Sequence, residues 1–152
     1  MKPLSGALLM LLVFSCTSVF GEELPFGQYL SEFDYFARKE MKIDSEALVK
    51  GIKEGEIQLI DIRFKEEFEA WRMGFAINIP LNELPARVKD LPKDKLIVTA
   101  CPHMDRAILA MAYLRTQGID SKYLTDGLVG LAEYLRGDQA RDFINKKSKS
   151  RQ

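Results

Sequence analysis

Short apolar runs alternate with amphipathic segments along most of the chain. The apolar runs predict buried strands at 57–61, 76–79, 95–100 and 122–124. In the segments between them, apolar residues recur every three or four positions, which is typical of helices. Such helices are expected over 28–42, 45–54, 65–71, 105–117 and 128–135, with a broken helical stretch at 81–91. This order, with short connections, predicts an α/β fold whose parallel sheet is covered by helices on both faces.

The N-terminus differs from the rest of the chain. Lys2 precedes the apolar run 4–14, and small residues follow as far as Gly21. This order is typical of a secretory signal peptide over 1–21, so we expect an exported, periplasmic protein. A single-pass membrane anchor is one alternative, and a lipoprotein attached to the membrane through Cys16 is another.

The remaining sequence divides into three parts. We expect a linker and an amphipathic helix at 22–42, one main domain at 43–137, and a helix with a basic tail at 138–152. The aromatic residues of the first helix indicate either a partner surface or, as we prefer, packing on the main domain. The full length of 152 residues suffices for one domain of ordinary size.

Composition excludes several kinds of function. The 22 basic and 22 acidic side chains balance, so the chain has no overall positive field of the kind that binds nucleic acid. One His and two Cys do not suffice for a usual zinc site or a disulfide framework. We therefore expect no nucleic-acid partner, no metal and no cofactor.

Cys101 is the strongest candidate for chemistry. It directly follows the strand 95–100, and a helix is expected to begin at Asp105. Ligands bind at the carboxyl ends of strands in open α/β sheets. Loop amides and a helix N-terminus at this point stabilise a thiolate, so we expect a lowered thiol pKa and a nucleophilic sulfur. The alternative is a small, inert residue buried at a strand end.

The loop from Cys101 to Arg106 resembles the active-site loop of rhodanese-type sulfurtransferases. Its sequence is Cys101-Pro102-His103-Met104-Asp105-Arg106. Three other segments are similar to motifs of that family and occur in the same order, at 59–68, 76–80 and 123–128. The resemblance covers 43–137, and four motifs in order make it specific.

The resemblance implies a parallel sheet of about five strands and transfer of sulfane sulfur. Cys101 would take sulfur from a small anion such as thiosulfate, forming a persulfide. The acceptor would be a thiol, cyanide or a sulfur-carrier protein. Arg106 would order the loop or attract the anionic donor. Asp61 and Arg63 are expected to fasten the site as a structural ion pair.

The loop departs from the family pattern at several positions. Met104 replaces a glycine, Pro102 lacks an N–H group, and Asp105 places a negative charge beside the thiol. His103 either assists proton transfer or shapes the entrance as an exposed side chain. Four residues separate Cys101 from Arg106, one fewer than in related phosphatase loops, which favours a single sulfur over a phosphate. The departures motivate an alternative function, a non-enzymatic sulfur-relay or persulfide-sensing module.

Overall fold

The computed structural model describes residues 24–149. The predicted signal peptide, its cleavage site and Cys16 lie outside this range. Among the described residues, no helix has the length and apolar character needed to cross a membrane.

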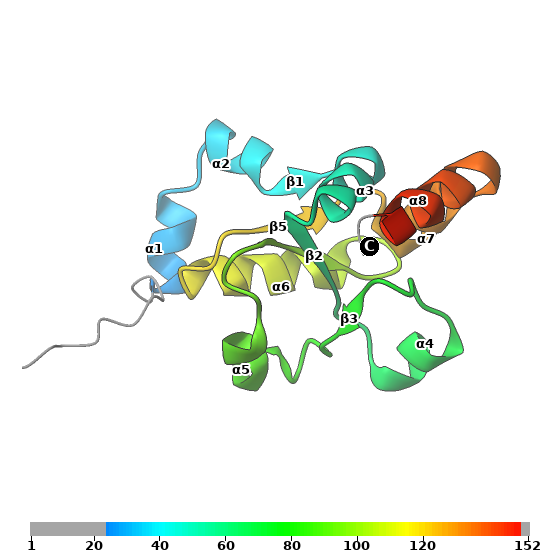
Figure 1. Cartoon of the computed structure of the whole chain (residues 1–152). Coiled ribbons are helices and arrows are strands. Elements are labelled where there is room, and N and C mark those ends of the chain that lie inside the picture. The colour runs from blue at the N-terminus through cyan, green and yellow to red at the C-terminus, as the bar shows by residue number, and fades with distance from the viewer. Residues whose placement is uncertain (1–23, 150–152) are drawn as a thin grey trace, which may run out of the picture.

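Five parallel strands form one sheet at the centre of the molecule (Figure 1). They are β1 (Lys42–Ile43), β2 (Ile57–Asp61), β3 (Ile77–Asn78), β4 (Leu96–Ala100) and β5 (Ser121–Leu124). Their order across the sheet is β1-β5-β4-β2-β3, and every neighbouring pair is parallel. The predicted α/β fold is therefore confirmed.

Helices cover both faces of this sheet. α5 (Leu84–Arg87) and α6 (Asp105–Thr116) contribute to one buried cluster. α3 (Ser45–Glu54), α7 (Gly127–Tyr134) and α8 (Gly137–Lys149) contribute to the other. Adjacent residues of β4 enter opposite clusters, as Ile97 and Val98 do. Burial on both faces explains why this strand is an unbroken apolar run in the sequence.

Two short helices lie in the connections between strands. α4 (Lys65–Ala70) follows β2, and the 3-10 helix η1 (Val88–Asp90) directly follows α5. Together, α5 and η1 form the broken helical stretch expected at 81–91. Pro85 lies in the first turn of α5, where its missing N–H costs little.

The single helix predicted over 28–42 is wrong. The segment forms α1 (Phe26–Ser31), α2 (Tyr35–Glu40) and then β1, which pairs with β5. Asp34 explains the break, because its extended backbone ends the helical run and its carboxylate accepts a hydrogen bond from Ala37 N at 2.7 Å. Asp is a favoured N-cap residue, so a second helix begins here.

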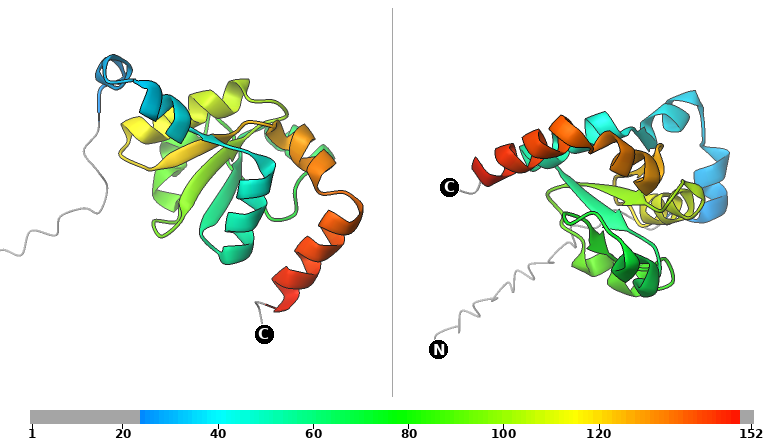
Figure 2. Two further views of the ribbon diagram at one scale, coloured as in Figure 1. Left: turned by 90° about the horizontal axis from the view of Figure 1, so that it is seen from above. Right: turned by 90° about the vertical axis from the view of Figure 1, so that its right-hand side faces the viewer.

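The N-terminal helices and α8 lie at opposite ends of the molecule (Figure 2). Neither α1 nor α2 contains a buried residue. α8 runs further than the short helix expected after residue 138, and its Phe143 is buried against Phe75 with ring centroids 5.0 Å apart.

Candidate active site

Cys101 lies at the carboxyl end of β4, which is a central strand of the sheet. The neighbouring strand is tied to this point, because Ile62 N donates to Ala100 O at 3.0 Å. The loop that follows Cys101 leads directly into α6. The predicted strand–loop–helix arrangement is therefore present, at the edge of the sheet where ligands bind in such folds.

The thiol of Cys101 is fully buried, with 0% exposure. Burial raises its pKa, because a charged sulfur would lose its hydration. The backbone N–H groups of Ala107 and Arg106 act in the opposite direction, since they stabilise the thiolate. Burial has the larger effect, so the lowered pKa predicted from the sequence is wrong.

Asp105 contacts the sulfur of Cys101. Its Oδ1 accepts a hydrogen bond from Cys101 Sγ at 3.3 Å. This bond favours the protonated thiol and so also raises the pKa of Cys101. The pKa of Asp105 itself is lowered, first by the N–H of Arg106 and then by the thiol. The resting site is therefore a thiol paired with a carboxylate.

The N-terminus of α7 holds the backbone of the loop. Leu128 N donates to Cys101 O at 2.8 Å, and Val129 N donates to Pro102 O at 3.2 Å. Gly127, with φ of +63°, makes this approach possible, because a Cβ there would lie 2.3 Å from the carbonyl oxygens of Pro102 and His103. The loop carbonyls are thus bound by α7, on the side away from α6.

Arg106 is bound by α4. Its Nη1 and Nη2 donate to the two carboxylate oxygens of Glu67 at 2.7 and 2.9 Å. The Arg106 guanidinium lowers the pKa of Glu67 from an ordinary 4.5 to about 2. In the sequence, Glu67 lies in the segment 59–68 that is similar to a family motif, but its partner Arg106 could not be predicted, since the two residues are 39 positions apart.

Asp61 and Arg63 form a buried ion pair, as expected. Arg63 Nη2 lies 2.7 Å from Asp61 Oδ2, and the two side chains are 1% and 0% exposed. The same guanidinium donates to Trp71 O at 2.7 Å and stacks 4.1 Å from the centroid of the Trp71 ring. The pair therefore fixes the connection around α4, which carries Glu67.

The remaining loop residues line the outside of the site. Pro102 is half-buried, whereas His103 and Met104 are exposed. Met104 has φ of −152°, and no non-glycine residue in the described range 24–149 has a positive φ. The glycine of the family pattern is thus replaced here without left-handed backbone.

Asp126 has a role that the sequence did not reveal. It lies in the segment 123–128, and its Oδ2 accepts a hydrogen bond from Ser45 N at 2.7 Å. This bond attaches the start of α7 to the start of α3. The sequence shows a carboxylate directly before the expected helix, but its partner lies 81 residues away.

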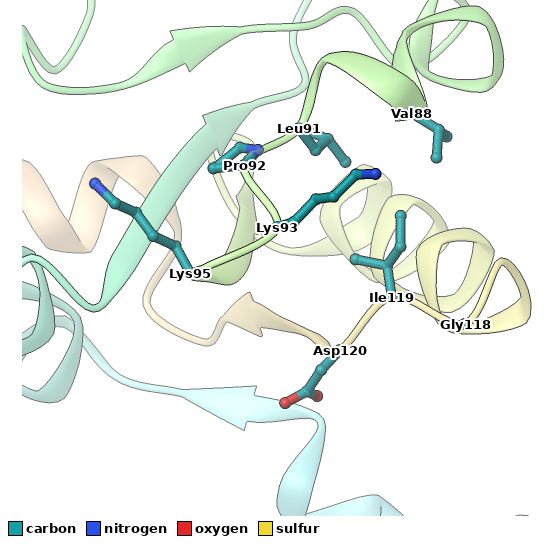
Figure 3. Close-up of a pocket in the computed structure, with 8 residues that line it drawn as sticks. All are labelled: Val88, Leu91, Pro92, Lys93, Lys95, Gly118, Ile119 and Asp120. Atoms are coloured by element: carbon teal, nitrogen blue, oxygen red, sulfur yellow. The ribbon is translucent and has the colours of Figure 1, made fainter. Parts of the chain in front are cut away.

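A pocket of about 150 Å³ lies at the amino ends of β4 and β5, opposite the end where Cys101 lies (Figure 3). Its lining residues precede β4 and β5, whereas Cys101 follows β4. The amino groups of Lys93 and Lys95 point in different directions, so they do not converge on one anion (Figure 3). Within residues 24–149, no group of three or more His, Cys, Asp or Glu side chains is arranged to hold a metal ion.

Comparison with protein families identifies the rhodanese-like domain as the matching family. The match covers residues 44–133, which include β2, the Cys101 loop and all but the last residue of α7.

Two individual relatives match parts of the chain. A "Sulfurtransferase" of Allochromatium vinosum is 35% identical over 78 residues, which cover 51% of this chain and 73% of the relative. An "HTH-type transcriptional regulator" of Mycobacterium tuberculosis is 30% identical over 119 residues, or 77% of this chain, and the match spans 53% of that protein. Thus the match takes in only about half of the second relative.

A solved structure has a similar fold. The crystal structure of a rhodanese-related protein from Thermoplasma volcanium superimposes with a TM-score of 0.56 and 27% identity. The similarity covers 60% of this chain and 90% of that structure. The superposition therefore covers nearly all of that structure but leaves a larger share of this chain unmatched.

Proposed function

The chain belongs to the rhodanese-like domain family, and from this premise we propose that it is an exported sulfurtransferase that carries sulfane sulfur on Cys101. The family includes sulfurtransferases, one of which matches half of this chain. The donor would be a small sulfur compound such as thiosulfate. The acceptor would be a thiol, cyanide or a sulfur-carrier protein.

One observation carries this proposal. The sulfur of Cys101 lies at the start of α6, where the N–H groups of Arg106 and Ala107 stabilise its anion. The same donors would stabilise the persulfide anion, as an oxyanion hole stabilises an alkoxide. The fixed loop backbone lets them act without rearrangement during the reaction.

The proposed reaction has two displacements. The thiolate of Cys101 attacks the outer sulfur of thiosulfate, the S–S bond of the donor breaks, and sulfite leaves with the electron pair. The acceptor, for example cyanide, then attacks the outer sulfur of the Cys101 persulfide. Thiocyanate forms and the thiolate returns. Such covalent catalysis gives ping-pong kinetics.

A second candidate, a non-enzymatic sulfur-relay or persulfide-sensing module, is supported by the environment of the thiol. Cys101 is fully buried, and both burial and Asp105 raise its pKa. A protonated, enclosed thiol is a slow nucleophile. In this role the loop would take up sulfur once, from a partner protein, and would not turn over.

A thiocyanate assay distinguishes the two candidates. Purified protein is incubated with thiosulfate and cyanide, in parallel with Cys101→Ser. Turnover that disappears in the variant supports the enzyme. A single added sulfur on Cys101, detected by mass spectrometry without turnover, supports the relay, and no sulfur on Cys101 from any donor rejects both.

Export is a separate part of the proposal. It rests on the apolar run 4–14 and the small residues up to Gly21. We expect the mature protein, isolated from the periplasm, to begin at Glu22. A mass that includes residues 1–21 contradicts cleavage, and a lipid on Cys16 supports the lipoprotein alternative.

A further inference from the structure

We propose that Asp105 selects the sulfur donor, favouring a persulfide of the form R–S–SH over thiosulfate. This inference rests on the proposed function, because it concerns the donor of the same Cys101 site. It names the donor as a thiol-borne persulfide whose transferable sulfur still carries hydrogen.

The first argument is the hydrogen bond at the thiol. An ionised carboxylate only accepts hydrogen bonds, and Asp105 Oδ1 accepts one from Cys101 Sγ at 3.3 Å. A donor R–S–SH brings an S–H group to the same place. Its transferable sulfur can therefore donate to Asp105 as it approaches.

The second argument is charge. Thiosulfate brings two negative charges and only acceptor atoms to the carboxylate of Asp105. Asp105 is exposed, but its Oδ1 lies 3.3 Å from Sγ, so like charges repel each other at that contact. The protonated form R–S–SH, which is the form that a thiolate attacks, is uncharged and meets no such repulsion.

The third argument concerns the arginines that could offset this repulsion. Arg106 is bound through both terminal nitrogens to Glu67, at 2.7 and 2.9 Å. Arg63 is buried and paired with Asp61. Each guanidinium already faces a carboxylate, so neither is available to a sulfonate group without breaking a pair.

The proposed step is balanced without an oxidant or reductant. The Cys101 thiol loses its proton to solvent, and the thiolate attacks the outer sulfur of R–S–SH. A bond forms between Sγ and that sulfur, while the S–S bond of the donor breaks. The electron pair goes to the inner sulfur, which leaves as R–S⁻ and takes a proton from solvent. The Cys101 persulfide forms with the donor's hydrogen on its outer sulfur, which donates a hydrogen bond to Asp105 until the persulfide ionises by losing this proton to solvent.

The test compares two donors on three proteins. Native protein, Asp105→Asn and Asp120→Asn are each treated with 2-hydroxyethyl persulfide or with sodium thiosulfate, at one pH and one donor concentration. Mass spectrometry follows the added sulfur on Cys101 after trapping with iodoacetamide. The measured quantity is the ratio of the persulfide rate to the thiosulfate rate. The thiolate fraction of Cys101 affects both rates equally, so it cancels in their ratio.

Asp120→Asn is the matched control. It removes the same charge from a side chain that is 82% exposed, at the other edge of the sheet. Asp105→Ser is included as a second variant in case Asp105→Asn does not fold. A persulfide on a short cysteine-containing peptide, as a third donor, distinguishes a polypeptide source from a small thiol.

We expect the ratio to fall about tenfold in Asp105→Asn, because the carboxylate charge opposes thiosulfate alone. In Asp120→Asn it should stay within about twofold of native, since that charge is far from the sulfur. A ratio in the Asp105 variants within about threefold of native overturns the inference and leaves the proposed function intact. If neither donor loads Cys101 in the native protein, the proposed function fails, and the inference with it.

Discussion

At the scale of single residues, Glu67 connects α4 to the loop that holds Cys101. Its carboxylate binds both terminal nitrogens of Arg106 and also accepts a hydrogen bond from Phe64 N at 3.2 Å. Arg106 follows directly on Asp105 at the start of α6. A change at Glu67 therefore affects the position of the loop without touching the sulfur.

We expect Glu67→Gln to destabilise the protein in a pH-dependent way. The pKa of Glu67 is lowered to about 2, so its contribution to stability is present above an ordinary pKa of 4.5 and is lost as the pH falls towards 2. Because the side chain is 37% exposed, solvent screening limits the effect to about 1 kcal/mol at pH 7. Urea unfolding at pH 7 and pH 3 measures it, and the difference from native protein should shrink at the lower pH.

Glu66→Gln is the control for this measurement. Glu66 is an exposed carboxylate in the same first turn of α4. It should change the unfolding free energy by less than about 0.5 kcal/mol at either pH. Equal effects of the two substitutions, or an effect of Glu67→Gln that grows in acid, would contradict the assigned ion pair.

At the scale of elements, α7 fixes the loop from the side opposite α6. Its first N–H groups bind loop carbonyls, and Gly127 lets the two backbones approach. Gly137 at the start of α8 has a similar positive φ of +53°, but a Cβ there would meet nothing within 4 Å. Both glycines therefore need a positive φ, but only Gly127 lies against the carbonyl oxygens of the Cys101 loop.

We expect Gly127→Ala to be more damaging than Gly137→Ala. Both substitutions place a side chain in the left-handed region, at a cost of about 1 kcal/mol. Only Gly127→Ala also forces the loop carbonyls of Pro102 and His103 to move, which adds about 1–3 kcal/mol. Urea unfolding gives the stability, and the rate of iodoacetamide labelling of Cys101 should change only in Gly127→Ala. Similar values for both variants would show that the loop is not held by this contact.

The same elements show how far the sequence predicts the structure. The strand–loop–helix unit at Cys101 was predictable, because an unbroken apolar run ending at a polar loop has few other interpretations. The two N-terminal helices were not, because one capping side chain, Asp34, overrode an apparent helical periodicity. The periodicity shows only the spacing of apolar residues, so it does not reveal that a single capping residue divides the segment into two helices.

The site was less predictable than the fold. The position of Cys101 and the pairing of Asp61 with Arg63 follow from local sequence. The direction of the thiol pKa does not, because it depends on burial and on the rotamer of Asp105. The partner of Arg106 lies on another helix, and only the folded chain brings it near.

At the scale of the whole molecule, the core and the site involve the same part of the chain. Both buried clusters are formed by residues from Met41 onward. By contrast, α1 has no buried residue, and the Tyr29 hydroxyl is enclosed there without a hydrogen-bond partner. An enclosed, unpaired hydroxyl offsets some of the gain from burying its ring.

We therefore expect a chain that begins at Asp34 to fold and to load sulfur on Cys101. It loses the hydrogen bond from Leu24 N to Thr116 O and the contacts of α1, so its unfolding free energy should fall by less than about 2 kcal/mol. Deletion from Gly137 onward is the comparison, because it removes buried Phe143 and should cost about 3–5 kcal/mol or more. Urea unfolding and mass spectrometry of Cys101 test both chains. If the chain that begins at Asp34 is unfolded, or folds but takes up no sulfur, α1 is needed for the fold or for sulfur loading, which contradicts this expectation.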